Sequence, residues 1–149
     1  MSSEEDLGPQ LSGRLAYLLK RAHLALADLH EELLAPVGVN HRELAILLLL
    51  DAREPESQQQ VAGRLGVDRT TMVALIDALE GKGLVARRPD AADRRRNVIA
   101  LTGAGRKTLR RATRASDQAE QRLLADLDQA EATHLRSLLS RVAAPGRDR

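Results

Sequence analysis

Three consecutive arginines, Arg94, Arg95 and Arg96, are the strongest candidates for binding chemistry in this sequence. They lie in residues 81–114, which carry eleven basic and two acidic side chains, whereas the whole chain has a net charge of only +2. Of the 23 basic side chains, 20 are arginine, and the planar guanidinium group suits bidentate contacts with phosphates and guanine edges. The segment therefore predicts a surface for an anionic polymer, with a solvated basic face as the alternative.

Four histidines are the other candidates for chemistry. His23 and His30 share one face of an expected helix, His41 begins the next helix, and His134 lies in the last one. A metal site needs ligands one helical turn apart or in a tight cluster. Because this spacing provides neither, the sequence predicts no metal ion, and structural histidines are the simpler interpretation.

Enzymatic chemistry has no supporting motif in the chain. The sequence contains no glycine-rich phosphate loop, no nucleophile elbow and no cluster of histidine and carboxylate at catalytic spacing. It has no cysteine, which removes disulfides, thiolate nucleophiles and sulfur-ligated zinc. We therefore expect neither catalysis nor a cofactor.

Composition narrows the class of protein further. The chain has 149 residues, 43% of them hydrophobic, which is one domain's worth of sequence with enough apolar residues for a core. Tyr17 is the only aromatic residue, which argues against stacking of single-stranded bases. No apolar run reaches the length of a membrane span, and the acidic start has no apolar signal core, so we expect a cytoplasmic protein without a membrane partner.

Turn residues and apolar periodicity divide the chain into five segments. Residues 1–10 are expected to form a disordered lead-in, and residues 145–149 a charged tail. Leucines at spacings of three and four predict one long helix over 11–39. Residues 40–102 predict a compact unit with its own core, and 103–144 predict two more amphipathic helices.

Residues 57–83 follow the spacing of a helix-turn-helix. Ser57 opens the first helix in a capping box with Gln60, and Gly66 ends it. After a short turn, Asp68 caps a longer helix. In this motif the first helix braces the second, whose N-terminal residues project towards base edges.

Two further capping boxes are predicted, one at Asn40 with Glu43 and one at Asp128 with Glu131. The first opens a short helix in which Leu44–Leu50 is apolar all round. Such a helix should be central and buried.

Two short strands, 84–88 and 97–101, follow the helix-turn-helix, and the turn between them carries the three arginines. A hairpin in this position is a wing, and an arginine-tipped ribbon fits a narrow minor groove with its enhanced negative potential. Since Arg87 and Arg88 alternate along a strand, they cannot both face the same partner. Helix-turn-helix and wing together predict binding of double-stranded DNA.

Three groups of polar side chains are candidates for contact with DNA. The second helix of the motif begins with arginine and threonine, which can read guanine, offer a hydroxyl to a phosphate or contact a thymine methyl group. The first helix begins with residues that can meet a phosphate or serve only as its cap. The candidates are Arg69, Thr70 and Thr71 in the second helix, Ser57 and Gln58 in the first, and Arg94, Arg95 and Arg96 in the wing.

The terminal helices carry apolar stripes that the compact unit leaves uncovered. A lone subunit exposing such stripes is prone to aggregation, so we expect a homodimer in which both ends of each chain pack on the partner. A two-fold dimer also reads a pseudo-palindrome, with its two reading helices about one turn of DNA apart. Folding back of the terminal helices in a monomer is the alternative.

Between Leu11 and Val142 the chain resembles the multiple-antibiotic-resistance regulator (MarR) family of winged helix-turn-helix repressors. The most specific stretches are Leu65–Val85 and Pro89–Gly105, and the second resembles the family's wing signature, Asp-x-Arg followed by a strand and Leu-Thr-x-x-Gly. The resemblance implies a mainly α fold with a small β-hairpin wing and N- and C-terminal dimerisation helices. It also implies that Asp93 holds the wing tip by pairing with an arginine and that Arg95 enters the minor groove.

The resemblance further implies a nucleoid-associated repressor of a bacterium or archaeon. Such a repressor leaves its operator when a small molecule, often a phenolic or aromatic acid, enters a cleft between the first two helices. Tyr17, His23 and His41 are the candidates for lining that cleft. Peroxide-sensing members need a cysteine and zinc-sensing members a histidine pair after the wing, and this chain has neither.

Two functions of different class stay open on these residues. One is a ligand-responsive repressor. The other is a constitutive architectural DNA-binding protein, which keeps the wing but has no effector. Release of DNA by an aromatic acid distinguishes the two.

Overall fold

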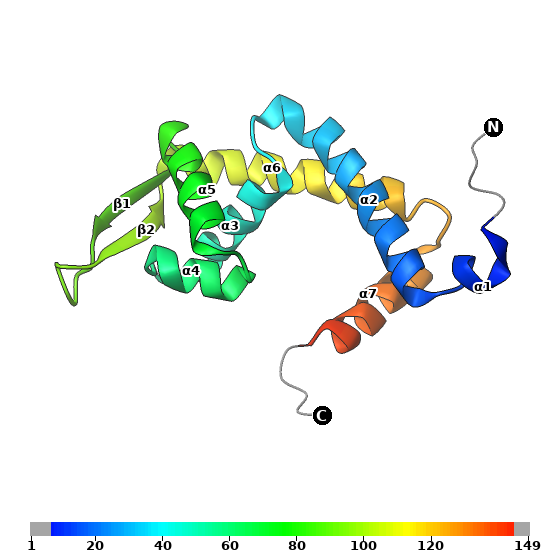
Figure 1. The fold of residues 1–149 in the computed structure, drawn as a ribbon. Coiled ribbons are helices and arrows are strands. Elements are labelled where there is room, and N and C mark those ends of the chain that lie inside the picture. The colour runs from blue at the N-terminus through cyan, green and yellow to red at the C-terminus, as the bar shows by residue number, and fades with distance from the viewer. Residues whose placement is uncertain (1–6, 145–149) are drawn as a thin grey trace.

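The computed structural model describes residues 7–144 (Figure 1). The expected tail of residues 145–149 and the first six residues of the expected lead-in lie outside this range. The elements are α1 (Gly8–Ser12), α2 (Leu15–Leu34), η1 (Ala35–Val37), α3 (His41–Ala52), α4 (Gln58–Leu65), α5 (Arg69–Gly81), β1 (Val85–Pro89), β2 (Asn97–Leu101), α6 (Gly103–Leu123) and α7 (Gln129–Ala143). The helices α3, α4 and α5 and the hairpin form one end of an elongated molecule, and α1 and α7 lie at the other.

Local capping chemistry sets most helix starts. The three predicted capping boxes, at Asn40, Ser57 and Asp128, are confirmed, because in each the cap and the residue three places later accept one another's backbone N–H. Asp68 caps α5 with its carboxylate. Gly66 ends α4 in the left-handed conformation, with φ of 64°, which glycine adopts without steric cost.

The helix predicted over residues 11–39 is interrupted near its start. The short α1 ends at Ser12, and after Gly13 the backbone of Arg14 is extended, with ψ of 136°, as the N-cap of α2. Glycine is the poorest helix former after proline, which favours a break at Gly13. The leucine spacing continues across this break, so periodicity alone does not reveal it. Residues 8–10, expected in the lead-in, belong to α1.

The predicted wing is an antiparallel hairpin, with Val85 opposite Leu101. A third backbone segment joins it, because the N–H of Ile99 donates to the carbonyl of Glu56 at 2.8 Å. The hairpin is therefore fastened to the segment that leads into α4.

The core lies where α3, α4, α5, the hairpin and α6 meet. Its helix α3 is central, as predicted, but the run Leu44–Leu50 is not buried all round, since Leu48 is 46% exposed. The reason is that one side of α3 finds no covering element in the described chain. The largest fully buried apolar side chains are Leu34, Ile46, Leu47, Met72, Ile76, Leu79, Ile99, Val61 and Val85.

One buried charge is matched inside this end of the molecule. Glu43 is only 2% exposed, and its two carboxylate oxygens each accept from Nζ of Lys82 at 2.9 Å. The same ammonium group donates to the carbonyl of Gly38 at 3.0 Å. Since Lys82 is the C-cap of α5, this contact ties the end of α5 to the start of α3.

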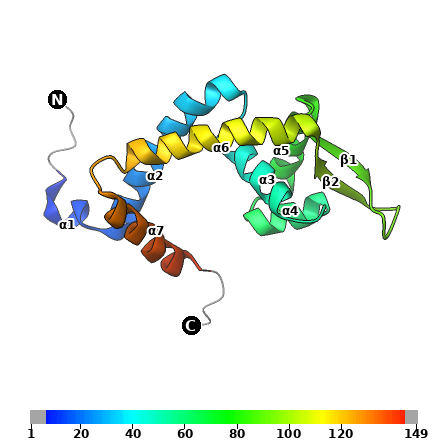
Figure 2. The same cartoon turned by 180° about the vertical axis from the view of Figure 1, so that it is seen from behind.

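Small residues allow α6 to pack closely on its neighbours. Its buried side consists of Gly105, Leu109, Ala112, Ala115 and Ala119. It contacts α3 and β2 at the winged end and α2 along the half that lies away from the wing, as both views show (Figures 1 and 2). A Cβ added at Gly105 would overlap the backbone carbonyl of Leu84.

Apolar side chains remain exposed on α1, α2 and α7. No residue of α7 is buried. The exposed apolar side chains just before α1 and on α1, α2 and α7 are Leu7, Leu11, Leu15, Leu18, Leu19, Leu24, Leu138, Leu139 and Val142. Part of the apolar stripes expected from the sequence is therefore uncovered within the described chain, whereas the stripe of α6 is buried at Leu109, Ala112 and Ala119.

Within residues 7–144 no single helix has both the length and the hydropathy of a membrane span. Two consecutive segments, Leu15–Val37 and His41–Ala52, reach those values together but are bent by 72°. Leu44, Ile46 and Leu47 in the second segment are buried in the core.

Gly105→Ala is expected to lower the free energy of unfolding by about 2–3 kcal/mol, because the new methyl group must displace the backbone at Leu84. Gly103→Ala is the matched control in the same helical turn, where nothing lies within 4 Å of the added Cβ and alanine is the better helix former. Urea denaturation measures the difference, and equal stability of the two variants would contradict the close approach.

Candidate nucleic-acid interface

A groove of about 640 Å³ lies between the starts of α4 and α5 and the wing residues Arg96 and Asn97. Four predicted contact residues line it, namely Ser57, Gln58, Arg69 and Arg96. The structure therefore brings both helices of the helix-turn-helix and the wing to one surface. Gln59, Gly63 and Asn97 also line the groove, although no sequence motif singled them out.

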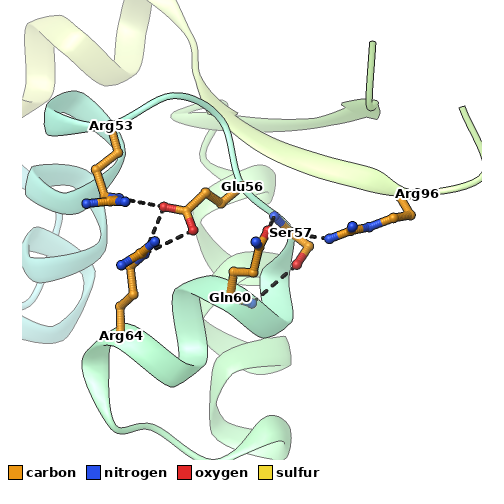
Figure 3. A network of polar contacts seen from close by, with 6 residues as sticks. All are labelled: Arg53, Glu56, Ser57, Gln60, Arg64 and Arg96. Carbon is orange, nitrogen blue, oxygen red and sulfur yellow. Dashed lines mark hydrogen bonds and ion pairs between the residues drawn. The ribbon is translucent and has the colours of Figure 1, made fainter. Parts of the chain in front are cut away.

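The start of α4 is held by its capping box and by the wing (Figure 3). Ser57 Oγ accepts from the Gln60 N–H at 3.2 Å, and Gln60 Oε1 accepts from the Ser57 N–H at 2.9 Å. Nη2 of Arg96 donates to the same Gln60 oxygen at 3.4 Å. The cap considered as an alternative role for Ser57 is formed, and its partner Gln60 also holds the end of the wing turn at Arg96.

Glu56 fixes the segment that leads into α4. Its carboxylate accepts from Arg53 Nε at 2.6 Å and from Arg64 Nε at 2.8 and 2.9 Å (Figure 3). The hydrogen bond from Arg53 is the main cause that lowers the pKa of Glu56, and Arg64 adds to it. No sequence pattern marks this cluster, because its members lie in a loop and at two helix ends, without a common period.

The three predicted contact residues at the start of α5 have different surroundings. The N–H and the hydroxyl of Thr71 donate to the Asp68 carboxylate at 2.8 and 2.7 Å, and these two bonds lower the pKa of Asp68. Thr71 is half-buried and lies with Ala45 of α3 along a different hollow. Arg69 lines the groove, and Thr70 is exposed. Thr71 differs from them because its hydroxyl proton is already donated to Asp68.

Asp93 orders the tip of the wing. Its carboxylate accepts from the backbone N–H of Arg95 at 3.1 Å and from Arg95 Nε at 3.3 Å, and its carbonyl accepts from the Arg96 N–H at 3.0 Å. The arginine that pairs with Asp93 is thus Arg95 itself. Because the Arg95 side chain is 92% exposed, this pair adds little stability, and Arg94 beside it is exposed too.

A second pocket, of about 500 Å³, lies at the junction of α2 and α3. His41, one of the three predicted cleft residues, lines it together with His30, whereas Tyr17 and His23 do not. The two imidazole rings are stacked, with centroids 6.1 Å apart and planes at 9°. Nε2 of His30 also lies 3.0 Å from Oγ of Ser116 on α6.

Among residues 7–144 the histidines and carboxylates do not gather into a metal site. No cluster of three or more histidine, cysteine, aspartate or glutamate residues is placed there to hold an ion. The groups that the pocket at α2 and α3 offers a ligand are the imidazole rings of His30 and His41 and the hydrogen-bonding side chains beside them.

Comparison with known proteins decides the family. A sequence model described as the MarR family matches residues 39–96, which include every residue of the groove except Asn97. The HTH-type transcriptional regulator PecS of Dickeya dadantii (strain 3937) is 30% identical over 127 residues, which cover 83% of this chain and 76% of PecS. The chain belongs to the MarR family.

Two solved structures support this MarR-family assignment. The repressor CouR bound to a 23-mer DNA duplex matches with a TM-score of 0.84 and 38% identity, over 91% of this chain and 96% of that one. CouR from Rhodococcus jostii RHA1 bound to p-coumaroyl-CoA matches with a TM-score of 0.80 and 30% identity, over 95% and 100% of the two chains. The predicted winged helix-turn-helix fold is confirmed, and the protein is a DNA-binding transcriptional regulator rather than an enzyme.

We expect His30 to make the stability of this MarR-family chain depend on pH. Burial is the main cause that lowers the pKa of His30, and His41 lowers it further, whereas Glu120 raises it. The unfolded chain then takes up the proton first, so stability is full above the unfolded pKa of about 6.5 and falls as the pH drops below it.

His30→Gln is expected to flatten this loss of stability between about pH 7 and pH 5. His134→Gln, at an exposed position of α7, is the control and should keep the wild-type slope. Urea denaturation at a series of pH values measures both. An unchanged slope in His30→Gln would remove the histidine pair as the cause.

Proposed function

We propose that this chain is a homodimeric repressor that holds a pseudo-palindromic operator and releases it when a small aromatic acid or its thioester binds. The groove shared by α4, α5 and the wing carries the proposal. The start of the recognition helix α5 and the end of the wing turn, at Arg96 and Asn97, line that groove together, and they carry side chains suited to phosphates and base edges.

Each element has its own part in the proposed grip. Arg69 and Thr70 enter the major groove at the start of α5, and Thr71 supports them through the Asp68 cap. Ser57 and Gln58 meet a phosphate at the start of α4. Arg94 and Arg96 contact phosphates, and Arg95, ordered by Asp93, enters the minor groove.

The proposed dimer follows from the exposed leucines of α1, α2 and α7. A monomer seldom exposes a continuous apolar face of this kind, and α7 contributes no residue to the core of its own chain. A second copy of the chain covers these faces and repeats the groove by two-fold symmetry. Two grooves then meet the half-sites of a pseudo-palindrome.

The proposed effector site is the pocket at α2 and α3. CouR, whose fold this chain shares, has been crystallised with p-coumaroyl-CoA, and the stacked rings of His30 and His41 offer faces to an aromatic group. Lys82 lines the pocket and caps α5, so a ligand that shifts it acts on the recognition helix. His23 and Tyr17, further along α2, are proposed to meet the part of a ligand that extends beyond the pocket.

The test of the function starts from DNA that the protein itself selects from a random pool of duplexes. We expect enrichment of a pseudo-palindrome with half-sites about 10 base pairs apart and a dimer in sedimentation. A panel of benzoates, p-coumarate and p-coumaroyl-CoA is then tested for release of the selected duplex. Selective binding without release by any compound would favour a constitutive architectural protein, and absence of selection would overturn the proposal.

Arg95→Ala is expected to weaken binding of the selected duplex by about 1–3 kcal/mol, because a minor-groove contact is lost. The fold should be unaffected, since the side chain is almost fully exposed. Arg141→Ala, on the exposed surface of α7, is the matched control. Fluorescence anisotropy at several salt concentrations measures both variants, and equal affinities would remove Arg95 from the interface.

A further inference from the structure

Arg87, in strand β1, turns its side chain away from the wing tip and towards the helix-turn-helix. Its guanidinium group donates from Nη1 to Glu80 Oε1 at 2.8 Å and from Nη2 to Asp77 Oδ1 at 2.7 Å. Its backbone N–H donates to the other Glu80 oxygen at 3.2 Å. Asp77 and Glu80 are three residues apart on α5, so one arginine joins the wing to one face of the recognition helix.

The same guanidinium group reaches α4. Nη2 of Arg87 donates to Gln58 Oε1 at 3.1 Å, so three elements meet at one side chain that is 27% exposed. The hydrogen bond with Asp77 is the main cause that raises the pKa of Arg87. The planar fork of arginine suits such multiple contacts, whereas lysine has a single ammonium group.

This contact orients the amide of Gln58. Arginine has only donors, so the atom of Gln58 that faces Arg87 is the carbonyl oxygen. The amide NH₂ is left to donate elsewhere, and Gln58 lines the groove. A phosphate accepts hydrogen bonds and does not donate them, so the oriented amide matches the backbone of DNA.

We propose that Arg87 is a positioning residue for DNA binding. It does not touch the duplex; it locks the wing to α5 and α4 and turns the Gln58 amide towards a phosphate. The proposal deepens the proposed function, because it rests on the DNA interface described above. It assigns to one of the basic residues of the 81–114 segment a role other than contact with phosphate.

The neighbouring arginine provides a matched control. Arg88 lies next to Arg87 on the same strand, but it is exposed and lines a different hollow together with Asp51 and Glu54. Arg87→Met and Arg88→Met therefore remove the same charge from the same strand. A difference between them reports the contacts of Arg87 and not the loss of positive potential.

The first measurement is the affinity for a duplex selected from a random pool by the wild-type protein. Arg87→Met is expected to weaken binding by about tenfold or more, with Arg88→Met within about threefold of wild type. Arg87→Lys should recover part of the loss. Thermal melting shows that each variant is folded, and equal losses in Arg87→Met and Arg88→Met would overturn the proposal.

The second measurement separates a positioning residue from a phosphate ligand by the sign of the effect. Asp77→Asn with Glu80→Gln removes two negative charges and loosens Arg87, because the amide oxygens that remain are neutral and weaker acceptors. If Arg87 were a phosphate ligand, its release would strengthen binding; as a clamp, its release weakens binding despite the gain in net charge. Asp51→Asn with Glu54→Gln is the control for net charge alone and is expected to leave binding equal or stronger.

The outcomes distinguish this proposal from the proposed function. If the wild-type protein selects no DNA sequence, the proposed function fails before Arg87 is tested. If the wild-type protein binds and the Asp77→Asn, Glu80→Gln variant binds as tightly as the Asp51→Asn, Glu54→Gln control, only the role of Arg87 is refuted.

Discussion

The close packing of α6 is the constraint on which the rest of the arrangement depends. Glycine and alanine on its buried side let its backbone approach Leu84 at the winged end and α2 along the remainder. Protein interiors are packed too densely to accommodate a change in such a contact without movement of the neighbours. The winged unit and α2 are therefore held in one orientation, and the pocket between α2 and α3 lies at the joint.

The arginines of this chain divide into two kinds. Arg53, Arg64 and Arg87 form ion pairs with carboxylates of neighbouring elements. Arg69 and Arg95 are instead exposed at the groove and the wing tip. A count of basic residues therefore overstates the number of contacts available to DNA. The internal pairs hold helices and wing together, and in the proposed function the exposed arginines meet the duplex.

The elements that the sequence predicts correctly are those that local chemistry decides. The capping boxes, the turn at Gly66 and the two strands depend on residues within a few places of one another, so they were predictable. The break at Gly13 and the exposed Leu48 depend on what packs nearby, and periodicity does not contain that information. For the same reason the alternation of Arg87 and Arg88 was foreseen, but not which of them turns towards α5.

The uncovered leucines of α1, α2 and α7 have a consequence for gene control. In the proposed assembly each copy depends on another to shield these side chains, so pairing obeys mass action. While pairs are scarce, operator occupancy rises roughly with the square of the copy number of the chain. A cell that halves its supply of this polypeptide then loses more than half of the silencing, which makes synthesis and proteolysis of the protein a second means of control beside the ligand.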